Sequence, residues 1–242
     1  MSTLTPDALL AVWEQGRAWR PASRGSDLAI ARAIGATQAD VAALPLGARN
    51  RSLLELRRGL FGRELSGTAA CPACHARTEF TLDADVLAAD PDAPPEPQIA
   101  ALDGDEVTFR LPSAADLYEA ARREPAEAAR AALLSRCILG ARRGAAPLPS
   151  GSVPEALLDL VIARMEALDP LAETQLRLTC ADCGTTWSAS LDLAAFFWSE
   201  LDLLARDLLR DVHRLASAYG WSEAAILAMS PARRQAYVEL LG

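Results

Sequence analysis

The chain has 242 residues, of which 51% are hydrophobic, and its formal net charge is −8. This composition predicts a folded globular protein rather than a disordered one, and the net acidity argues against nucleic acid as the main partner. No apolar run is long enough to span a membrane, and the N-terminus lacks the basic and apolar regions of a signal peptide. We therefore expect a cytoplasmic protein without a membrane partner, whose thiols stay reduced and free to bind metal.

Residues 1–66 are expected to form a helical N-terminal region. Thr5 and Pro6 are typical of a helix start. A second helix is predicted over 26–34 and a third from about 48 to 61, because apolar residues recur there at helical spacing. The polar side of the third helix carries four arginines: Arg49, Arg51, Arg57 and Arg58. We interpret them as a solvated helix face, with an acidic protein partner as the alternative.

After residue 66 the sequence changes to the alternation typical of β-strands. The alternation follows the cysteines of CPACHARTEFTLD, where Phe80 and Leu82 share one face, and it returns in 174–192. Helical spacing resumes in 193–242, which opens with a long amphipathic helix. The expected fold class is therefore α+β, mainly α-helical.

The residues between the two strand-like segments, 85–173, are predicted to contain a linker, a hairpin and helices. The linker is the Pro-rich stretch 90–97, and the hairpin turns at Asp103-Gly104. Ser113 is positioned to cap a helix that begins at Ala114. Two further helices are expected at about 125–139 and 154–168.

Two CxxC pairs give the strongest chemical signal: Cys71 with Cys74, and Cys180 with Cys183. Each CxxC turn directs two thiolates at one ion, and two such turns complete the tetrahedral set that zinc prefers. The segments CPACHARTEFTLD and CADCGTTWSASLD align both cysteines and a later Leu-Asp pair. We therefore predict a zinc-ribbon-like β unit made of 67–84 and 174–192, with 85–173 inserted, that holds one structural zinc ion.

Other interpretations of the cysteines compete with zinc. Redox motifs place CxxC at the start of a helix, whereas strand-like residues follow these pairs, and a reducing compartment disfavours disulfides. Chance burial of core thiols is a third alternative. His75, beside Cys74, is an alternative fourth ligand. Cys137 lies in a helical apolar run and is predicted to be a buried core thiol.

No arrangement of residues predicts catalysis, so we expect a protein that is not an enzyme. His213 lies in a helical stretch without a nucleophile motif, and a surface or core role is expected for it. There is neither a GxGxxG motif nor a P-loop.

Residues 211–241, DVHRLASAYGWSEAAILAMSPARRQAYVELL, resemble the end of the baseplate hub assembly chaperone family of T-even-like phages, which has relatives in phage-derived contractile injection systems. The matching residues are Val212, His213, Leu215, Ala216, Tyr219, Gly220, Trp221, Ser222, Glu223, Ile226, Leu227, Arg233, Arg234, Tyr237 and Leu240. The segments LPLGARNRSLLELRRGLFG and VTFRLPSAADL also resemble this family. The resemblance implies a role in baseplate or tail assembly, with other baseplate and tail proteins as partners.

Four residues of this C-terminus are candidates for partner binding: Trp221, Arg233, Arg234 and Tyr237. The alternative for the aromatic residues is packing on the core, together with Ile226 and Leu240, whereas the two arginines are expected at the surface. Trp221 and Ile226 also have the spacing of a hydrophobic staple around a helix capped by Ser222. The alternative functions are a zinc-ribbon regulator that binds nucleic acid and a thiol-disulfide enzyme.

Overall fold

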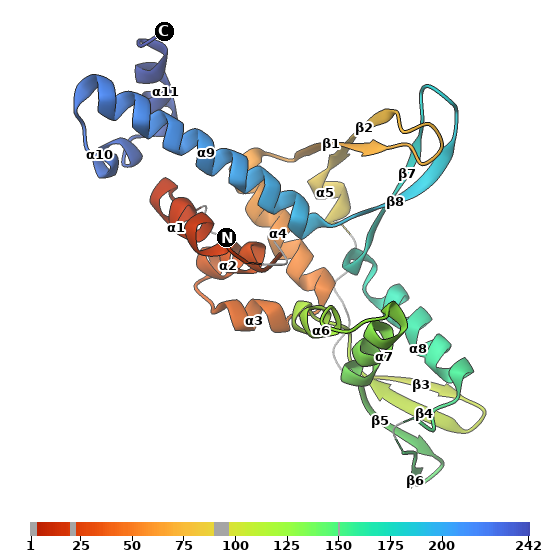
Figure 1. Ribbon diagram of the computed structural model, residues 1–242. Helices are drawn as coiled ribbons and strands as arrows, with labels where there is room; N and C mark the ends of the chain where they lie inside the picture. The colour runs from red at the N-terminus through yellow and green to blue at the C-terminus, as the bar shows by residue number, and fades with distance from the viewer. Residues whose placement is uncertain (1–3, 20–22, 90–96, 150) are drawn as a thin grey trace. The chain divides into compact units, whose positions relative to one another are not determined.

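The computed structural model describes residues 4–19, 23–89, 97–149 and 151–242 (Figure 1). Helices predominate and the strands form small sheets, so the α+β, mainly α-helical class is confirmed. Residues 90–96 of the predicted Pro-rich linker lie outside the described residues.

The chain forms two compact units. The first joins residues 1–38 to 193–242, and the second comprises 39–192. The predicted N-terminal region 1–66 is therefore divided between the two units. The boundary expected at residue 193 coincides with the start of the second segment of the first unit.

The first unit is built from helices. They are α1 (Pro6–Gly16), α2 (Ser23–Ile34), α9 (Leu193–Tyr219), α10 (Glu223–Leu227) and α11 (Pro231–Glu239). The ring of Trp198 on α9 packs where Gly16 of α1 and Gly25 of α2 leave room for it. A Cβ atom at either glycine would lie 2.3 Å from the ring, so this contact between three helices requires both glycines.

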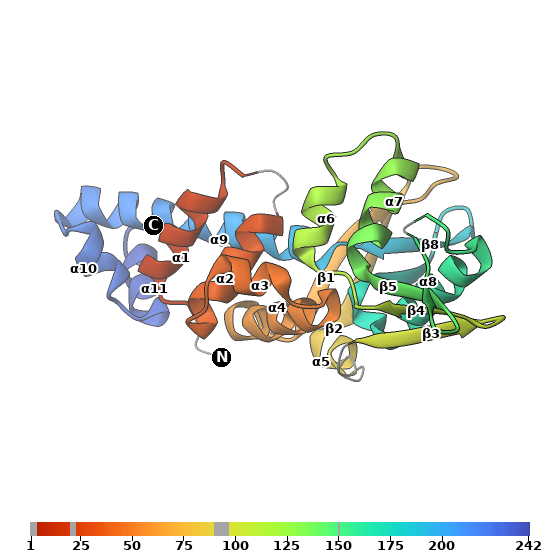
Figure 2. The same ribbon diagram turned by 90° about the horizontal axis from the view of Figure 1, so that it is seen from below.

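The last two helices, α10 and α11, fold back on the C-terminal part of α9 (Figures 1 and 2). The predicted N-cap of Ser222 is present, because its side chain accepts a hydrogen bond from the backbone N–H of Ala225, and Ser230 caps α11 in the same way through the N–H of Arg233. Trp221 and Ile226 pack in one apolar cluster with Leu215 of α9. This cluster confirms the predicted hydrophobic staple.

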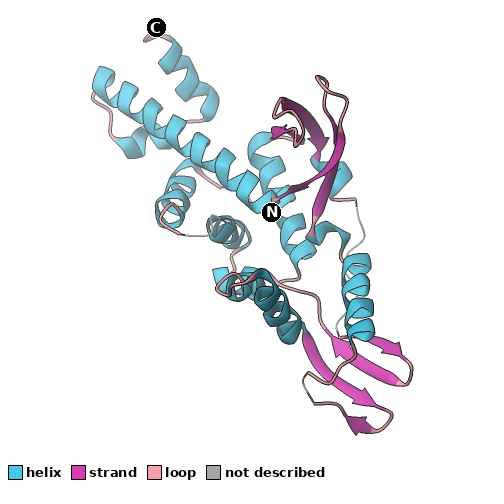
Figure 3. Cartoon of the chain, turned by 45° about the vertical axis from the view of Figure 1, so that its right-hand side comes forward, coloured by secondary structure: helices cyan, strands magenta, loops and turns pink. Residues whose placement is uncertain are grey.

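The second unit holds the β-structure, drawn in magenta in Figure 3. Its described strands are β1 (Glu64–Ala70), β2 (Arg77–Asp83), β3 (Gln98–Leu102), β4 (Asp105–Phe109), β5 (Ile138–Arg143), β6 (Ala146–Pro147), β7 (Thr174–Thr179) and β8 (Thr186–Leu191). The pairs β1-β2 and β7-β8 form antiparallel hairpins, and β3-β4-β5-β6 form an antiparallel sheet.

The second unit also contains helices. They are α3 (Gln38–Ala43), which begins at the last residue of the first unit, α4 (Leu46–Phe61), α5 (Ala84–Leu87), α6 (Ala114–Ala120), α7 (Ala126–Cys137), α8 (Glu155–Leu168) and the 3-10 turn η1 (Pro170–Ala172). Helix α8 packs on β3 and β4, and its Val161 shares a buried core with Phe109 of β4. The predicted cap of Ser113 on α6 is confirmed as a full capping box.

The predicted hairpin around Asp103-Gly104 is confirmed. Both residues have positive φ, 54° and 85°, as a two-residue turn of type I′ requires. The helix expected over 125–139 ends earlier, at Cys137, and the chain continues as strand β5. Strand β5 is poor in β-branched residues, but it pairs with β4. Arg143 of β5 donates two hydrogen bonds, of 2.6 and 2.7 Å, to the carboxylate of Asp105 on β4.

The arginines of α4 do not form a solvated face as predicted. Arg49 and Arg57 are only 5% and 3% exposed. Arg57 donates hydrogen bonds to the carbonyl oxygens of Gly62 (3.0 Å) and Glu64 (2.8 Å), so it joins the end of α4 to the start of β1. The other two arginines contact neighbouring elements: Arg51 donates to the carbonyl of Ala88, and Arg58 pairs with Asp85 at 2.9 Å.

Candidate metal centre

The first cysteine pair lies in the turn between β1 and β2. The backbone N–H of Cys71 donates to the carbonyl of Ala76 at 2.9 Å, and the N–H of His75 donates back to the carbonyl of Cys71 at 2.9 Å. These two bonds close a compact knuckle that presents the thiols of Cys71 and Cys74 on one side.

The second pair lies in the turn between β7 and β8 and repeats the same bonds. The N–H of Cys180 donates to the carbonyl of Thr185 at 2.9 Å, and the N–H of Gly184 donates to the carbonyl of Cys180 at 3.0 Å. The sequence similarity of the two segments therefore corresponds to two knuckles with equivalent backbone structure. Figures 1 and 3 show the two hairpins beside each other in the second unit.

One residue in each knuckle adopts a left-handed backbone conformation. Gly184 has φ 71°, and His75, at the equivalent position of the first knuckle, has φ 61°. Glycine suits this conformation because it has no Cβ atom. The side chain of His75 is exposed and does not belong to the cluster of four cysteines that could hold a metal ion, so the structure does not support histidine as the fourth ligand.

The four cysteine thiols form one cluster. The sulfur atoms of Cys71 and Cys183 are 3.7 Å apart, those of Cys74 and Cys180 are 3.6 Å apart, and all four lie within 4.8 Å of one another. A tetrahedral ion with metal–sulfur bonds of about 2.3 Å separates its ligands by about 3.8 Å. The arrangement therefore fits a single metal ion held by four thiolates.

The distances also bear on the disulfide alternative. A disulfide requires sulfur atoms about 2.05 Å apart, whereas the sulfur atoms that face each other across the two pairs are 3.6 and 3.7 Å apart. All five cysteines lie within the described residues and are free thiols. The redox alternative is disfavoured by the fold as well, because each CxxC pair lies in a turn between strands and does not open a helix.

Neighbouring groups perturb the protonation of the exposed cysteines. The hydroxyl of Thr185, 3.3 Å from the Cys183 sulfur, and the Thr185 backbone lower the pKa of Cys183 to about 6. A backbone hydrogen bond from Ala76 lowers the pKa of Cys74, but hydrogen bonds with the Cys183 and Cys180 thiols, together with desolvation, outweigh it and raise that pKa to about 12. Metal binding would displace the thiol protons that form these hydrogen bonds, because cysteine binds a metal ion as the thiolate.

A metal ion at this point joins chain segments that are far apart in sequence. Cys74 and Cys180 are 106 positions apart, and closing a loop of that length costs about 4 kcal/mol of chain entropy. Because all four ligands come from the protein, the coordination shell has no open position for water or substrate. A metal ion held in this way would therefore stabilise the second unit.

The other predicted residues lie away from this centre. Cys137 is 1% exposed in the core formed with Phe109 and Val161, which confirms it as a buried core thiol. His213 is exposed on α9, consistent with the surface role expected for it.

The candidate partner-binding residues lie in the first unit and differ in exposure. Trp221 stacks on Tyr219 with 4.6 Å between ring centroids and meets Tyr237 edge-on at 4.9 Å. Arg233 is exposed, and its guanidinium lies 5.7 Å from the centre of the Tyr237 ring. Tyr219 was not among the predicted partner-binding residues, although the motif Tyr-Gly-Trp places it close to Trp221 in the sequence.

Two predictions about this C-terminus are wrong. Arg234 was expected at the surface, but it is 6% exposed and pairs with Asp211 of α9 at 3.2 Å. It faces α9 because helix α11 turns residues 234 and 238 inward, so the ion pair helps to fix α11 on α9. Leu240 was expected to pack on the core, but it is 75% exposed, because it follows the last residue of α11.

Comparisons with protein-family models, with curated proteins and with solved structures found no match to this chain. Among the described helices, none is both long and apolar enough to cross a membrane. The fold and the site together define a mainly helical α+β protein with a four-cysteine centre that could hold one metal ion.

Proposed function

We propose that this protein is a non-catalytic, zinc-containing component or assembly chaperone of the baseplate of a contractile phage tail or a phage-derived injection system. It acts in the bacterial cytoplasm through contacts with other baseplate and tail proteins. The resemblance of residues 211–241 to the baseplate hub assembly chaperone family suggests this role. The observation that carries it is a partly exposed aromatic surface built from those same residues.

We call this surface the aromatic tip and define it as Tyr219, Trp221, Arg233, Tyr237 and Leu240. Tyr219 is 39% exposed and Leu240 is 75% exposed, while Trp221 and Tyr237 are half-buried. The three rings contact one another at centroid distances between 4.6 and 5.9 Å, so they are already ordered before a partner binds. Tryptophan, tyrosine and arginine are the residues that most often dominate protein interfaces.

The charge of the tip favours an acidic partner. Arg233 forms no ion pair with any residue that the structure describes, whereas its neighbour Arg234 is paired with Asp211. An unpaired arginine above an aromatic ring offers a carboxylate a flat surface and several hydrogen-bond donors. Arg233 is therefore the charged contact of the tip, and Arg234 is a positioning residue that holds α11 in place.

Zinc is the metal that suits the four-cysteine centre best in a protein of this kind. Four thiolates in a tetrahedral arrangement suit zinc or iron–sulfur chemistry, and zinc is the usual ion of closed structural sites with this ligand set. The proposed function needs no redox activity, because a closed centre contributes stability and leaves the recognition of partners to the surface of the protein.

Complementation of a deletion strain tests the assembly role. Deleting the gene should leave sheath and tube proteins expressed, while electron microscopy should show particles that are absent or lack a baseplate. Arg233→Glu should fail to restore assembly although the protein stays folded, because like charges at an interface cost several kcal/mol. Arg32→Glu, the same charge change at an exposed α2 residue that forms no ion pair with any described residue, is the matched control and should restore particles.

The outcomes separate two claims. Normal particles from the deletion strain would refute the assembly role altogether. A deletion that abolishes particles, combined with full rescue by Arg233→Glu, would leave assembly supported but would reject the aromatic tip as the contact surface.

A further inference from the structure

The second unit contains an open groove of about 700 Å³ that the metal centre does not use. Residues of α6, α7, α8, η1 and the β7-β8 hairpin line it. Its volume falls within the range of sites that bind ligands or peptide side chains. The lining includes six large apolar side chains from the helices: Leu46 of α4, Leu117, Leu133, Leu134, Ile162 and Met165.

The apolar wall on the side of α6 and α7 is only partly covered by the protein itself. Leu117 of α6 is 40% exposed, and Leu133 and Leu134 of α7 are half-buried. On the opposite side, Met165 of α8 is 8% exposed and belongs to the core. A complementary apolar segment in the groove would cover the leucines that the fold leaves in contact with water.

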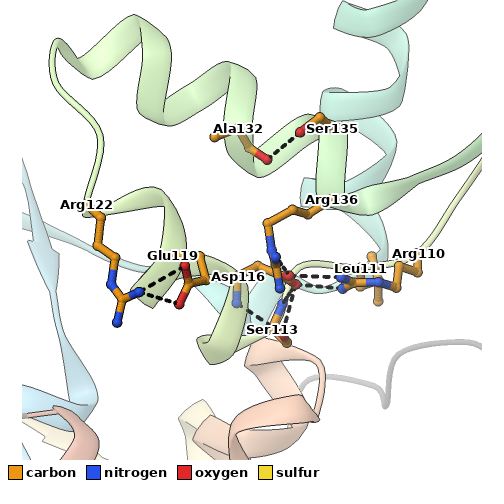
Figure 4. A network of polar contacts seen from close by, with 9 residues as sticks. All are labelled: Arg110, Leu111, Ser113, Asp116, Glu119, Arg122, Ala132, Ser135 and Arg136. Atoms are coloured by element: carbon orange, nitrogen blue, oxygen red, sulfur yellow. Dashed lines mark hydrogen bonds and ion pairs between the residues drawn. The ribbon is translucent and has the colours of Figure 1, made fainter. Parts of the chain in front are cut away.

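A buried polar network fixes this wall in position. Asp116 of α6 is completely buried and accepts hydrogen bonds from Arg110 at 2.6 and 2.9 Å and from Arg136 of α7 at 2.7 Å. Figure 4 shows its carboxylate between the two guanidinium groups, with Ser113 completing the network. Because one carboxylate joins α6, α7 and the end of β4, the groove is formed before any ligand arrives.

The charges at the groove favour cations. Three of its four charged lining residues are acidic. Arg130 is already paired with Asp159 at 3.5 Å, and Asp169 is buried and accepts a hydrogen bond from the backbone of the α4 N-terminus. Glu166 and Glu173 are exposed, and neither forms an ion pair with a residue that the structure describes.

We propose that this groove binds an amphipathic segment of a partner protein, with apolar side chains against Leu117, Leu133 and Leu134 and a lysine or arginine against Glu166 and Glu173. Apolar anchors flanked by a complementary charge are the usual way in which a helix occupies a hydrophobic groove. The inference does not depend on the proposed baseplate role, because it concerns a different unit and a partner of opposite charge to the one proposed for the aromatic tip.

Two synthetic peptides of about four helical turns test the proposal with the purified full-length chain. Both carry leucine at helical i, i+3, i+4 and i+7 spacing, and their flanking positions are lysine in one and glutamate in the other. Fluorescence anisotropy should give at least about tenfold tighter binding of the lysine peptide. Leu117→Glu, a change at a partly exposed position, should abolish this binding without unfolding the protein.

Charge variants separate the groove from the general acidity of the chain. The double variant Glu166→Arg with Glu173→Arg should reverse the preference toward the glutamate peptide. Glu14→Arg with Glu79→Arg changes the net charge equally at two exposed residues outside the groove lining, and it should retain the preference for lysine.

Equal affinity for the two peptides, or equal effects of the two double variants, would overturn the proposal. Sedimentation velocity tests the competing occupant, a second copy of this chain. A concentration-dependent dimer that only the Glu166→Arg, Glu173→Arg variant disrupts would also overturn it. Neither result would bear on particle assembly in the deletion strain, so the two proposals fail separately.

Discussion

At the scale of single residues, the two knuckles adopt the same left-handed backbone conformation with different side chains. The position after the second cysteine needs positive φ, which Gly184 adopts without strain and His75 adopts despite its Cβ atom. The alignment of the two segments places these residues at the same position, but spacing alone does not show which backbone conformation they take.

Gly184→Ala should lower the free energy of unfolding of the metal-loaded protein by about 1–2 kcal/mol, because alanine is strained in the left-handed conformation. Gly140→Ala is the matched control, since that glycine has no left-handed φ and nothing lies within 4 Å of an added Cβ atom. It should change the unfolding free energy by less than about 0.5 kcal/mol. Equal losses in guanidinium unfolding would contradict the role assigned to the knuckle turn.

Asp116 gives a second prediction at this scale. Burial raises the pKa of Asp116, but hydrogen bonds from Arg110, Ser113 and Arg136 outweigh it and hold that pKa well below its usual range. The contribution of this carboxylate to stability is therefore complete above its unfolded pKa of about 3.9. It is lost as the pH falls through the lower folded pKa.

Asp116→Asn should cost about 3 kcal/mol of unfolding free energy at neutral pH, because two arginines lose their buried partner. The cost should shrink in acid as the wild-type carboxylate protonates. Asp85→Asn breaks an exposed pair with Arg58, with side chains about half exposed, so it should cost at most about 1 kcal/mol. Urea unfolding at several pH values checks this, and a pH-independent cost of Asp116→Asn would contradict it.

At the scale of elements, the two kinds of β-structure depend on different interactions. The sheet β3-β6 has a buried core with α8 that includes Phe109 and Val161. The hairpins β1-β2 and β7-β8 are two-stranded, and such hairpins are marginally stable alone. The metal centre at their turns is therefore expected to supply much of their stability.

Chelation of the metal followed by hydrogen exchange tests whether the hairpins depend on the metal while the sheet β3-β6 does not. Removing the metal should raise the exchange rates of amides in β1, β2, β7 and β8, whereas amides of β3 and β4 should keep most of their protection. The physical reason is that opening is local where few apolar contacts hold the backbone. Equal loss of protection in both groups of strands would show that the sheet also depends on the metal.

The elements that the sequence predicted correctly have local signals. Thr5-Pro6, Asp103-Gly104 and Ser113 specify their helix starts and turn through their own backbone preferences. Strands β1 and β5 were missed because they contain few strand-forming residues and are formed by pairing with β2 and β4.

The candidate site was predictable in part for the same reason. The CxxC spacing identified the four cysteines that the structure brings together, because each turn is local. The burial of Arg57 and Arg234 was not predictable from the sequence. The carbonyl oxygens that Arg57 contacts, and the Asp211 carboxylate that Arg234 contacts, come within reach only when the chain is folded.

At the scale of the whole molecule, many arginines already have partners, and this bears on the nucleic-acid alternative. Arg58, Arg142 and Arg143 pair with carboxylates, and the net charge is −8. We expect no measurable binding of fluorescent duplex DNA or RNA at physiological salt. An affinity that falls steeply between low and physiological salt would show that phosphates are being neutralised, and it would favour the zinc-ribbon regulator.

We expect one structural zinc ion to join the two knuckles, and elemental analysis of protein purified without chelator tests this expectation. We predict one zinc and no stoichiometric iron per chain. Cys71→Ser or Cys183→Ser should lose the metal and much of the stability, because binding energy at such a site is also folding energy. Cys137→Ser, at a cysteine outside the cluster, should keep the zinc. Wild-type protein that is folded but contains no stoichiometric metal would contradict this expectation.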